Sequence, residues 1–127
     1  MGPGSVGGKE RRFDEATLRF LPEGVIRIEG RILSRNVDGE FEQCLGRFHV
    51  GALAEGHKRI VVDVARLEWI SESAVTALVG WVLAIQREPT EKRYHVVFRI
   101  NSAVPWQHGT FLALRSVAPE VVGIESA

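Results

Sequence analysis

The sequence predicts a single α/β domain, in which about three helices pack on a mixed sheet of four or five strands. Three observations lead to this prediction. Residues 17–32 alternate apolar and polar side chains, as strands with one buried face do. Residues 59–65 and 94–100 are nearly continuous β-branched runs, typical of strands buried on both faces. Apolar residues at helical spacing separate these runs, and such alternation of strands and helices favours parallel pairing.

The first elements are a pair of strands and a helix. Residues 17–21 and 25–32 are separated by a Pro-Glu-Gly turn, which predicts a β-hairpin. From Asn36 the period changes to that of a helix, which should end near Gly56. Cys44 lies on the apolar stripe of this helix, so we expect it to be buried and inert. That stripe consists of Val37, Phe41, Cys44, Leu45, Phe48 and Ala52.

The second half of the chain alternates strands and helices. The expected ranges are 59–65 (strand), 72–87 (helix), 94–100 (strand), 103–117 (helix) and 121–125 (strand). Ser102 is the expected N-cap of the last helix, and Pro105 is tolerated in its first turn. The predicted order of elements is therefore β-β-α-β-α-β-α-β.

The N-terminal segment has a different composition from the rest. Residues 1–15 are rich in glycine and polar side chains, so we expect them to be flexible. The letters GPGS within them are typical of an expression-tag remnant. A phosphate-binding loop is excluded, because Pro3 replaces the required first glycine and Glu10 follows Lys9. We expect residues 16–127 to form the one domain.

Composition and charge exclude several classes of function. Lys+Arg and Asp+Glu are both 16, and a formal net charge of zero argues against binding to nucleic acid or to an anionic membrane surface. The longest apolar stretch, AVTALVGWVLAI, is shorter than the ~20 residues that cross a bilayer, so membrane insertion is not expected. The single cysteine and the spacing of the four histidines fit no metal site. We expect a cytoplasmic protein without a cofactor.

The junction between the strand at 59–65 and the next helix carries the most specific pattern. After VVDV come Trp69 and Ile70, and then SESAV. With the order of elements and the segments GRILSRNV and INSAV, this junction resembles that of STAS domains, which are named for sulfate transporters and anti-sigma factor antagonists. The resemblance covers roughly residues 16–125. Members carry an aspartate, a serine, a second serine or threonine and a glycine here, and partner kinases phosphorylate one of the hydroxyls.

The resemblance assigns a role to each residue of this junction. It places Ser71 at the family's aspartate and Glu72 at the phosphorylated serine or threonine, while Ser73 keeps the second hydroxyl and Ala74 replaces the glycine. A serine kinase cannot phosphorylate a carboxylate, so Glu72 would resemble a permanent phosphoserine with about −1 charge instead of about −1.5 to −2. We expect no phosphate at position 72, and none at Ser71 or Ser73.

The function implied by the resemblance is regulatory. Family members bind an anti-sigma factor or a partner-switching kinase, so this chain is expected to be a protein–protein interaction module and not an enzyme. No G-x-S-x-G motif supports a hydrolase triad through Ser71. Two alternatives remain open: a STAS subunit that docks on the ATPase of a lipid-transport ABC complex, and a domain that binds a small molecule or nucleotide. A homo-oligomer is also left open.

The junction also has a purely structural explanation. Ser71 would cap the helix, worth ~1 kcal/mol, and Glu72 would be a favourable first-turn acid, worth ~0.3–1 kcal/mol. Both explanations can hold together, since the positive end of a helix favours an anion whether or not a partner binds there.

The predicted partner surface is the N-terminal end of the helix at 72–87 with its outward face. Val75, Leu78, Val79, Val82 and Ile85 form the core stripe of this helix, which leaves Trp81 outside it. Either Trp81 packs on the first helix, or it is an exposed aromatic anchor. Trp69 and Trp106, near the same sheet edge, are interpreted as core residues. The predicted partner-binding residues are Ser34, Arg35, Ser71, Glu72, Ser73, Thr76 and Trp81.

Overall fold

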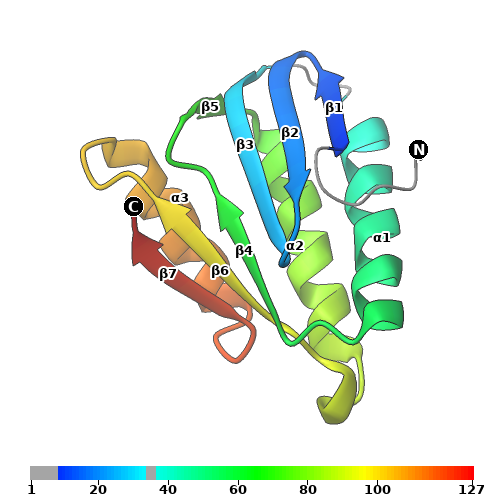
Figure 1. Ribbon diagram of the computed structural model, residues 1–127. Coiled ribbons are helices and arrows are strands. Elements are labelled where there is room, and N and C mark those ends of the chain that lie inside the picture. Colours follow the sequence, from blue (N-terminus) through cyan, green and yellow to red (C-terminus); the bar gives the residue numbers. More distant parts are fainter. Residues whose placement is uncertain (1–8, 34–36) are drawn as a thin grey trace.

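The chain folds into strands and helices that alternate along most of its length (Figure 1). The computed structural model of the protein describes residues 9–33 and 37–127. The strands are β1 (Lys9–Phe13), β2 (Glu15–Leu21), β3 (Val25–Ile32), β4 (Arg59–Asp63), β5 (Leu67–Ile70), β6 (His95–Ile100) and β7 (Val122–Ser126). The helices are α1 (Val37–Glu55), α2 (Glu72–Arg87) and α3 (Pro105–Val117), with a 3₁₀ turn, η1 (Thr90–Lys92).

All strands of the described residues belong to one mixed sheet. The strand order is β1-β2-β3-β4-β6-β7, and β5 lies beside the second half of β3. β1, β2 and β3 pair in antiparallel fashion, and every pair that follows a helical crossover is parallel. The predicted class, a mixed α/β sheet with three helices packed on it, is confirmed.

The sheet is larger than the four or five strands expected, because seven strands pair in the described part of the chain. The additional ones are β1 and β5. β1 occupies residues 9–13 and pairs with β2, so part of the segment expected to be flexible forms a strand, while residues 1–8 lie outside the described residues. Its polar sequence carries no alternating pattern, and β5, with four residues, is too short to show one.

The predicted N-cap of α3 is also wrong. α3 begins at Pro105, and its N-cap is Val104, which makes no side-chain capping hydrogen bond. Asn101 explains the later start, because its Oδ1 accepts the N–H of Ala103 at 2.9 Å and its carbonyl accepts the N–H of Val104 at 3.0 Å. This local turn holds Ser102 outside the helix. Pro105 takes the first helical position, where its missing N–H leaves no bond unmade.

The three helices cover one face of the sheet (Figure 1). The strands turn alternate side chains toward them, such as Ile26 and Ile28 of β3, Ile60 of β4 and Phe98 of β6, all at most 2% exposed. Cys44 of α1 lies in the same core, as the apolar stripe predicted. α2 has neighbours on two sides, since it contacts α1 as well as the sheet.

The opposite face of the sheet carries a row of charged residues. The strand register aligns Glu10, Arg19, Arg27, Asp63, Arg99 and Glu125 across the sheet. Asp63 lies 3.7 Å from Arg27 and 3.9 Å from Arg99, and Arg99 lies 2.8 Å from Glu125. Partly exposed ion pairs contribute only ~0–1 kcal/mol each. The main effect of this row is therefore to keep the face polar, and its contribution to the stability of the sheet is small.

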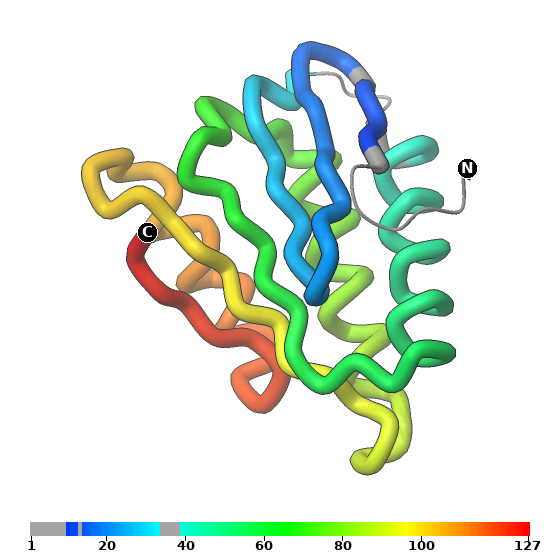
Figure 2. The backbone as a smooth tube through the Cα atoms, viewed as in Figure 1, coloured from blue at the N-terminus to red at the C-terminus, as the bar shows by residue number. Residues whose placement is uncertain are grey.

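β3 changes its neighbour partway along its length, from β4 to β5 (Figure 2). Its first half pairs with β4, its second half pairs with β5, and the register shifts between Gly30 and Arg31. The φ angle of Gly30 is 95°, and a Cβ at this position would lie only 2.2 Å from the carbonyl oxygen of Glu15 in β2. Both the backbone conformation and the close approach of β2 therefore require glycine.

Candidate functional site

The predicted junction lies at the edge of the sheet where β5 ends and α2 begins. Ser71 alone separates the two elements, and its Oγ accepts the N–H of Ala74 at 3.3 Å, which confirms it as the N-cap. Glu72 is exposed in the first turn of α2, and Thr76 is exposed four residues further on the same face. Ser73 between them is half-buried. The positive end of α2 thus presents a carboxylate and a hydroxyl to solvent.

Fewer residues of α2 are exposed than a helix with a single buried stripe would have. The exposed residues along it are Glu72, Thr76, Gly80 and Arg87. Ala77 lies outside the predicted core stripe of this helix but is only 6% exposed, because α1 packs against α2.

Trp81 lies in the interior, so its assignment as an exposed partner anchor is wrong. The side chain is 4% exposed, and its Nε1 donates to the hydroxyl of Tyr94 at 2.9 Å. Its ring meets Phe48 of α1 edge to face, with 6.0 Å between ring centroids. The alternative, that Trp81 packs on the first helix, is confirmed. A helix buried on two sides needs an apolar surface wider than one stripe, and Trp81 supplies the second side.

Tyr94 joins Trp81 to a polar network at the C-terminal end of α2. Its hydroxyl lies 2.7 Å from Nδ1 of His49, and Nε2 of His49 lies 3.1 Å from a carboxylate oxygen of Glu88. Burial raises the pKa of Tyr94 above its ordinary value, so the hydroxyl stays neutral. These bonds tie α1 and the C-terminal half of α2 to the residue that precedes β6.

Trp69 of β5 is the large exposed aromatic residue of the junction. Its exposed fraction is 49%, so the interpretation of Trp69 as a core residue is wrong. Trp106 of α3 supports it from one side, with 5.7 Å between the ring centroids in an edge-to-face contact. Trp106 itself packs against the core and donates its indole N–H to the carbonyl of Glu68 at 3.0 Å. Local spacing gave no signal of this, because burial does not alternate along β5: Leu67 and Ile70 are buried, and Glu68 and Trp69 between them are exposed.

A buried glutamine fixes the backbone that leads to Trp69. Gln107 of α3 is 0% exposed, and its Nε2 donates to the carbonyls of Val64 and Leu67, both at 2.8 Å. Its Oε1 accepts the N–H of Asn101 at 2.7 Å. The side chain therefore bonds two carbonyls of the β4–β5 turn and one N–H just after β6, and so links these two segments to α3.

The charges around the junction are mainly carboxylates in the described residues. Arg31, the register partner of Trp69, lies 3.0 Å from Glu15 and 3.9 Å from Glu68. Glu72 forms no ion pair with any described residue. The two remaining residues of the predicted surface, Ser34 and Arg35, lie outside the described residues. The structure thus brings together Ser71, Glu72, Ser73 and Thr76 at this surface, whereas Trp81 is buried and does not belong to it.

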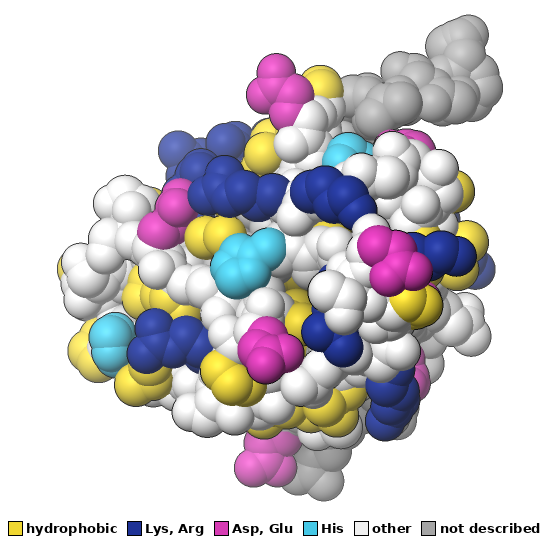
Figure 3. Space-filling view, turned by 90° about the horizontal axis from the view of Figure 1, so that it is seen from below, with side chains coloured by type: hydrophobic (Ala, Val, Ile, Leu, Met, Phe, Trp, Pro, Cys, Tyr) yellow, Lys and Arg dark blue, Asp and Glu magenta, His cyan; other side chains and the backbone are white. Residues whose placement is uncertain are grey.

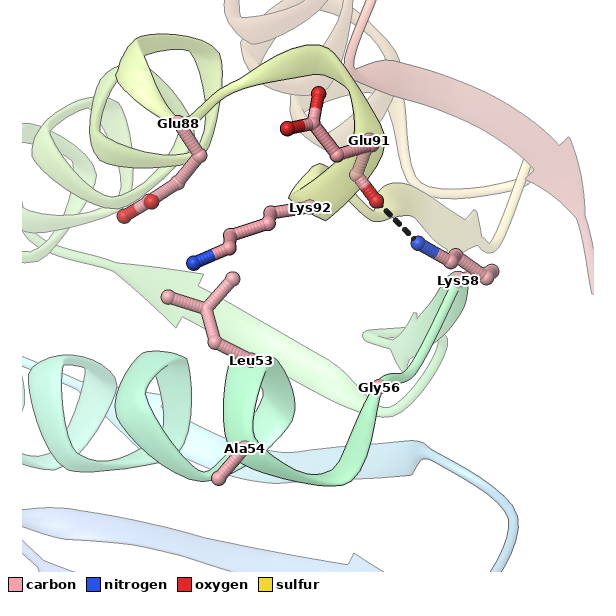
Figure 4. A pocket seen from close by; sticks show the side chains of 7 residues that line it. All are labelled: Leu53, Ala54, Gly56, Lys58, Glu88, Glu91 and Lys92. Atoms are coloured by element: carbon pink, nitrogen blue, oxygen red, sulfur yellow. Dashed lines mark hydrogen bonds between the residues drawn. The ribbon is translucent and has the colours of Figure 1, made fainter.

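A shallow pocket lies at the opposite end of the molecule (Figure 4). It has a volume of about 420 Å³, and Lys92 extends across it toward Glu88 and Leu53. Lys58 at its rim donates to the carbonyl of Glu91 at 2.6 Å. Figure 3, which looks at the molecule from below, shows acidic, basic and apolar side chains interspersed over this end. Of the predicted site residues that the structure describes, none lines the pocket.

Two further features bear on the class of protein. Among the residues described here, none of the helices is both long enough and apolar enough to cross a membrane. In the same part of the chain, no three His, Cys, Asp or Glu side chains come together as metal ligands would.

Comparisons with known proteins find similarity in structure alone. No protein-family description matches the sequence, and no curated protein matches it. Among solved structures, a chain in the crystal structure of the diguanylate cyclase SiaD in complex with its activator SiaC, from Pseudomonas aeruginosa, superposes with a TM-score of 0.70 at 13% identity, over 94% of this chain and 99% of that chain. SiaC of Pseudomonas aeruginosa matches with a TM-score of 0.65 at 15% identity, over 98% and 95% of the two chains.

The apo form of SiaC gives a third match of the same kind, with a TM-score of 0.67 at 16% identity, over 97% of this chain and 94% of that chain. At these identities the likeness establishes the fold. SiaC has a STAS-like fold, so the fold implied by the sequence resemblance is confirmed.

Proposed function

We propose that this protein is a non-catalytic regulatory module, which binds a protein partner through the N-terminal end of α2. The observation that carries the proposal is the position of Glu72. It is an exposed carboxylate in the first turn of a serine-capped helix, without an ion-pair partner among the described residues. By the resemblance to STAS domains, this is the position of a phosphorylated hydroxyl, and Glu72 supplies a weaker, permanent negative charge there.

Charge at such a surface governs which partner is accepted. A partner that approaches α2 meets the carboxylate of Glu72 and the hydroxyl of Thr76 side by side, and complementary charge on the partner would speed association and fix the register of docking. SiaC, which has a similar fold, forms a complex with the diguanylate cyclase SiaD and is its activator. This complex supports a role for the present chain in regulating a partner by binding to it. An anti-sigma factor, a kinase, an ABC ATPase and a cyclase are the partner classes that the experiment below separates.

Glu72→Lys is expected to abolish partner binding without unfolding the protein. The substitution reverses the charge at the positive end of α2, so it opposes a complementary partner and also loses the favourable first-turn acid, at most ~1 kcal/mol of stability. Glu72→Gln, which removes the charge, should weaken binding by at least about tenfold, since close charge pairs across an interface contribute ~1.5 kcal/mol or more. The partner is captured from the native cell, identified by mass spectrometry, purified, and its affinity for each variant measured by calorimetry.

Glu91→Gln is the matched control. It makes the same change at an exposed acid of η1, beyond the C-terminal end of α2. Wild-type affinity is expected for this variant. Glu72→Thr adds a second test, since a hydroxyl at this position would make binding depend on phosphorylation. A partner that binds Glu72→Lys as tightly as the wild type would contradict the proposal.

A further inference from the structure

We infer that the partner segment that docks beside Glu72 is basic and apolar, and that it places an arginine or lysine side chain on the exposed ring of Trp69. This inference rests on the proposed function and specifies the chemistry of the partner. It is carried by two observations at the β5–α2 junction: a half-exposed tryptophan held from one side, and an excess of carboxylates around it.

The first observation is the way in which Trp69 is presented. A tryptophan that is 49% exposed leaves much of its indole surface in water, which is unfavourable unless another molecule covers it. The ring is not loose, because Trp106 supports it edge to face and is itself fixed by its bond to the Glu68 carbonyl. Leu33, 43% exposed, follows Ile32, whose register partner is Ile70, and extends the apolar surface along the same edge.

The second observation is the charge that surrounds the ring. Glu68 and Glu72 lie one residue before and three residues after Trp69 in the chain. Glu72 has no cationic partner among the described residues, and Glu68 has only Arg31 at 3.9 Å, which also serves Glu15 at 3.0 Å. With Arg66, which directly precedes β5 and lies 3.5 Å from Glu29, two arginines face four carboxylates among the described residues of this junction. The open ring face, the adjacent acids and the apolar Leu33 match a segment in which a cation is flanked by aliphatic residues.

Arginine fits this surface better than other side chains. Its guanidinium plane stacks on an indole face, and its N–H groups can bond a neighbouring carboxylate at the same time. An acidic segment would bring like charges together at Glu68 and Glu72. A wholly apolar segment would cover Trp69 but would leave Glu72 desolvated and unpaired, which is costly.

The test uses a random 12-residue peptide library displayed on phage and selected on the immobilised wild-type protein. We expect enriched sequences with arginine or lysine next to aliphatic or aromatic residues. A synthetic peptide of the enriched sequence should bind Trp69→Ala at least about tenfold more weakly than wild type, and Trp69→Phe with a smaller loss, because phenylalanine keeps an aromatic face. Its binding should also weaken as salt rises toward physiological levels. Val117→Ala, a change at another exposed apolar residue, in the last turn of α3, should bind as wild type does.

Each other result overturns the inference. Enriched peptides that are acidic or uncharged, binding that survives Trp69→Ala in a protein that melts as wild type does, or no enrichment above the naive library would all do so. Sedimentation velocity tests whether the surface instead binds a second copy of this chain. Wild-type dimers that the Trp69→Ala substitution dissociates would show that it does, and would overturn the inference.

The proposed function fails separately. Basic peptides that depend on Glu72 but not on Trp69 would leave it standing while the inference falls. A native partner that is indifferent to Glu72→Lys would remove the proposed function itself.

Discussion

Replacement of Gly30 by alanine is expected to cost so much stability that the domain loses its cooperative unfolding transition. The φ angle of 95° is unfavourable for any residue with a Cβ, by ~1–3 kcal/mol. The clash comes in addition, because the new Cβ would lie 2.2 Å from the Glu15 carbonyl oxygen, and the atom that must move belongs to the backbone of β2. Relief of the clash would separate β2 from β3 at the point where β3 changes from β4 to β5. Urea unfolding followed by circular dichroism measures the loss.

Gly80→Ala is the matched control for this prediction. Gly80 lies within α2 on its exposed face, and nothing lies within 4 Å of the position that its Cβ would occupy. Here the same substitution should stabilise the protein by ~0.5–1 kcal/mol, because alanine has a higher helix propensity than glycine. If both alanine variants shift the midpoint of unfolding in the same direction, the reason given for Gly30 is wrong.

Trp81→Ala is expected to destabilise the protein by ~3–5 kcal/mol, the range for deletion of a large buried aromatic side chain. The substitution opens a cavity between α1 and α2, removes the edge-to-face contact with Phe48 and takes away the indole donor of Tyr94. Trp81→Phe separates these effects, since it keeps most of the ring but not the N–H, and should cost ~1–3 kcal/mol. Chemical denaturation and thermal melting report both.

Trp69→Ala is the comparison for this prediction, because it deletes the same side chain at an exposed position. Trp69→Ala removes a half-exposed ring, so its melting temperature should stay much closer to wild type than that of Trp81→Ala. The opposite ranking of the two alanine variants would show that the burial assigned to these tryptophans is reversed.

The elements with strong periodicity could be predicted from the sequence. The hairpin of β2 and β3, the three helices and the parallel strands β4, β6 and β7 all appear where their patterns indicated, within a few residues at the ends. β1 and β5 could not be predicted in this way. β1 is polar, and β5 has four residues, so what decides both is pairing, of β1 with the adjacent β2 and of β5 with the distant β3, which local periodicity does not report.

The candidate site was predicted in its polar part and missed in its aromatic part. Ser71 and Glu72 follow from capping chemistry, which is local, and the structure places them at the first turn of α2. The roles of Trp81 and Trp69 depend on which helix or strand lies beside each ring. A single apolar stripe did not reveal that α1 covers a second side of α2. A short strand gave no warning that Trp69 faces outward. Burial of a lone tryptophan is a tertiary property, so it could not be derived from spacing alone.

The amide of Gln107 has a consequence for how fast and how selectively the junction can bind. Its bonds to the carbonyls of Val64 and Leu67 hold the β4–β5 turn in one conformation before any partner arrives. Ordering a backbone residue costs ~1–2 kcal/mol, and here that cost is met during folding and not during association. The junction is therefore preorganised, and a partner docks on a rigid surface. Since Gln107 belongs to α3, any movement of that helix would also disturb the surface that carries Trp69.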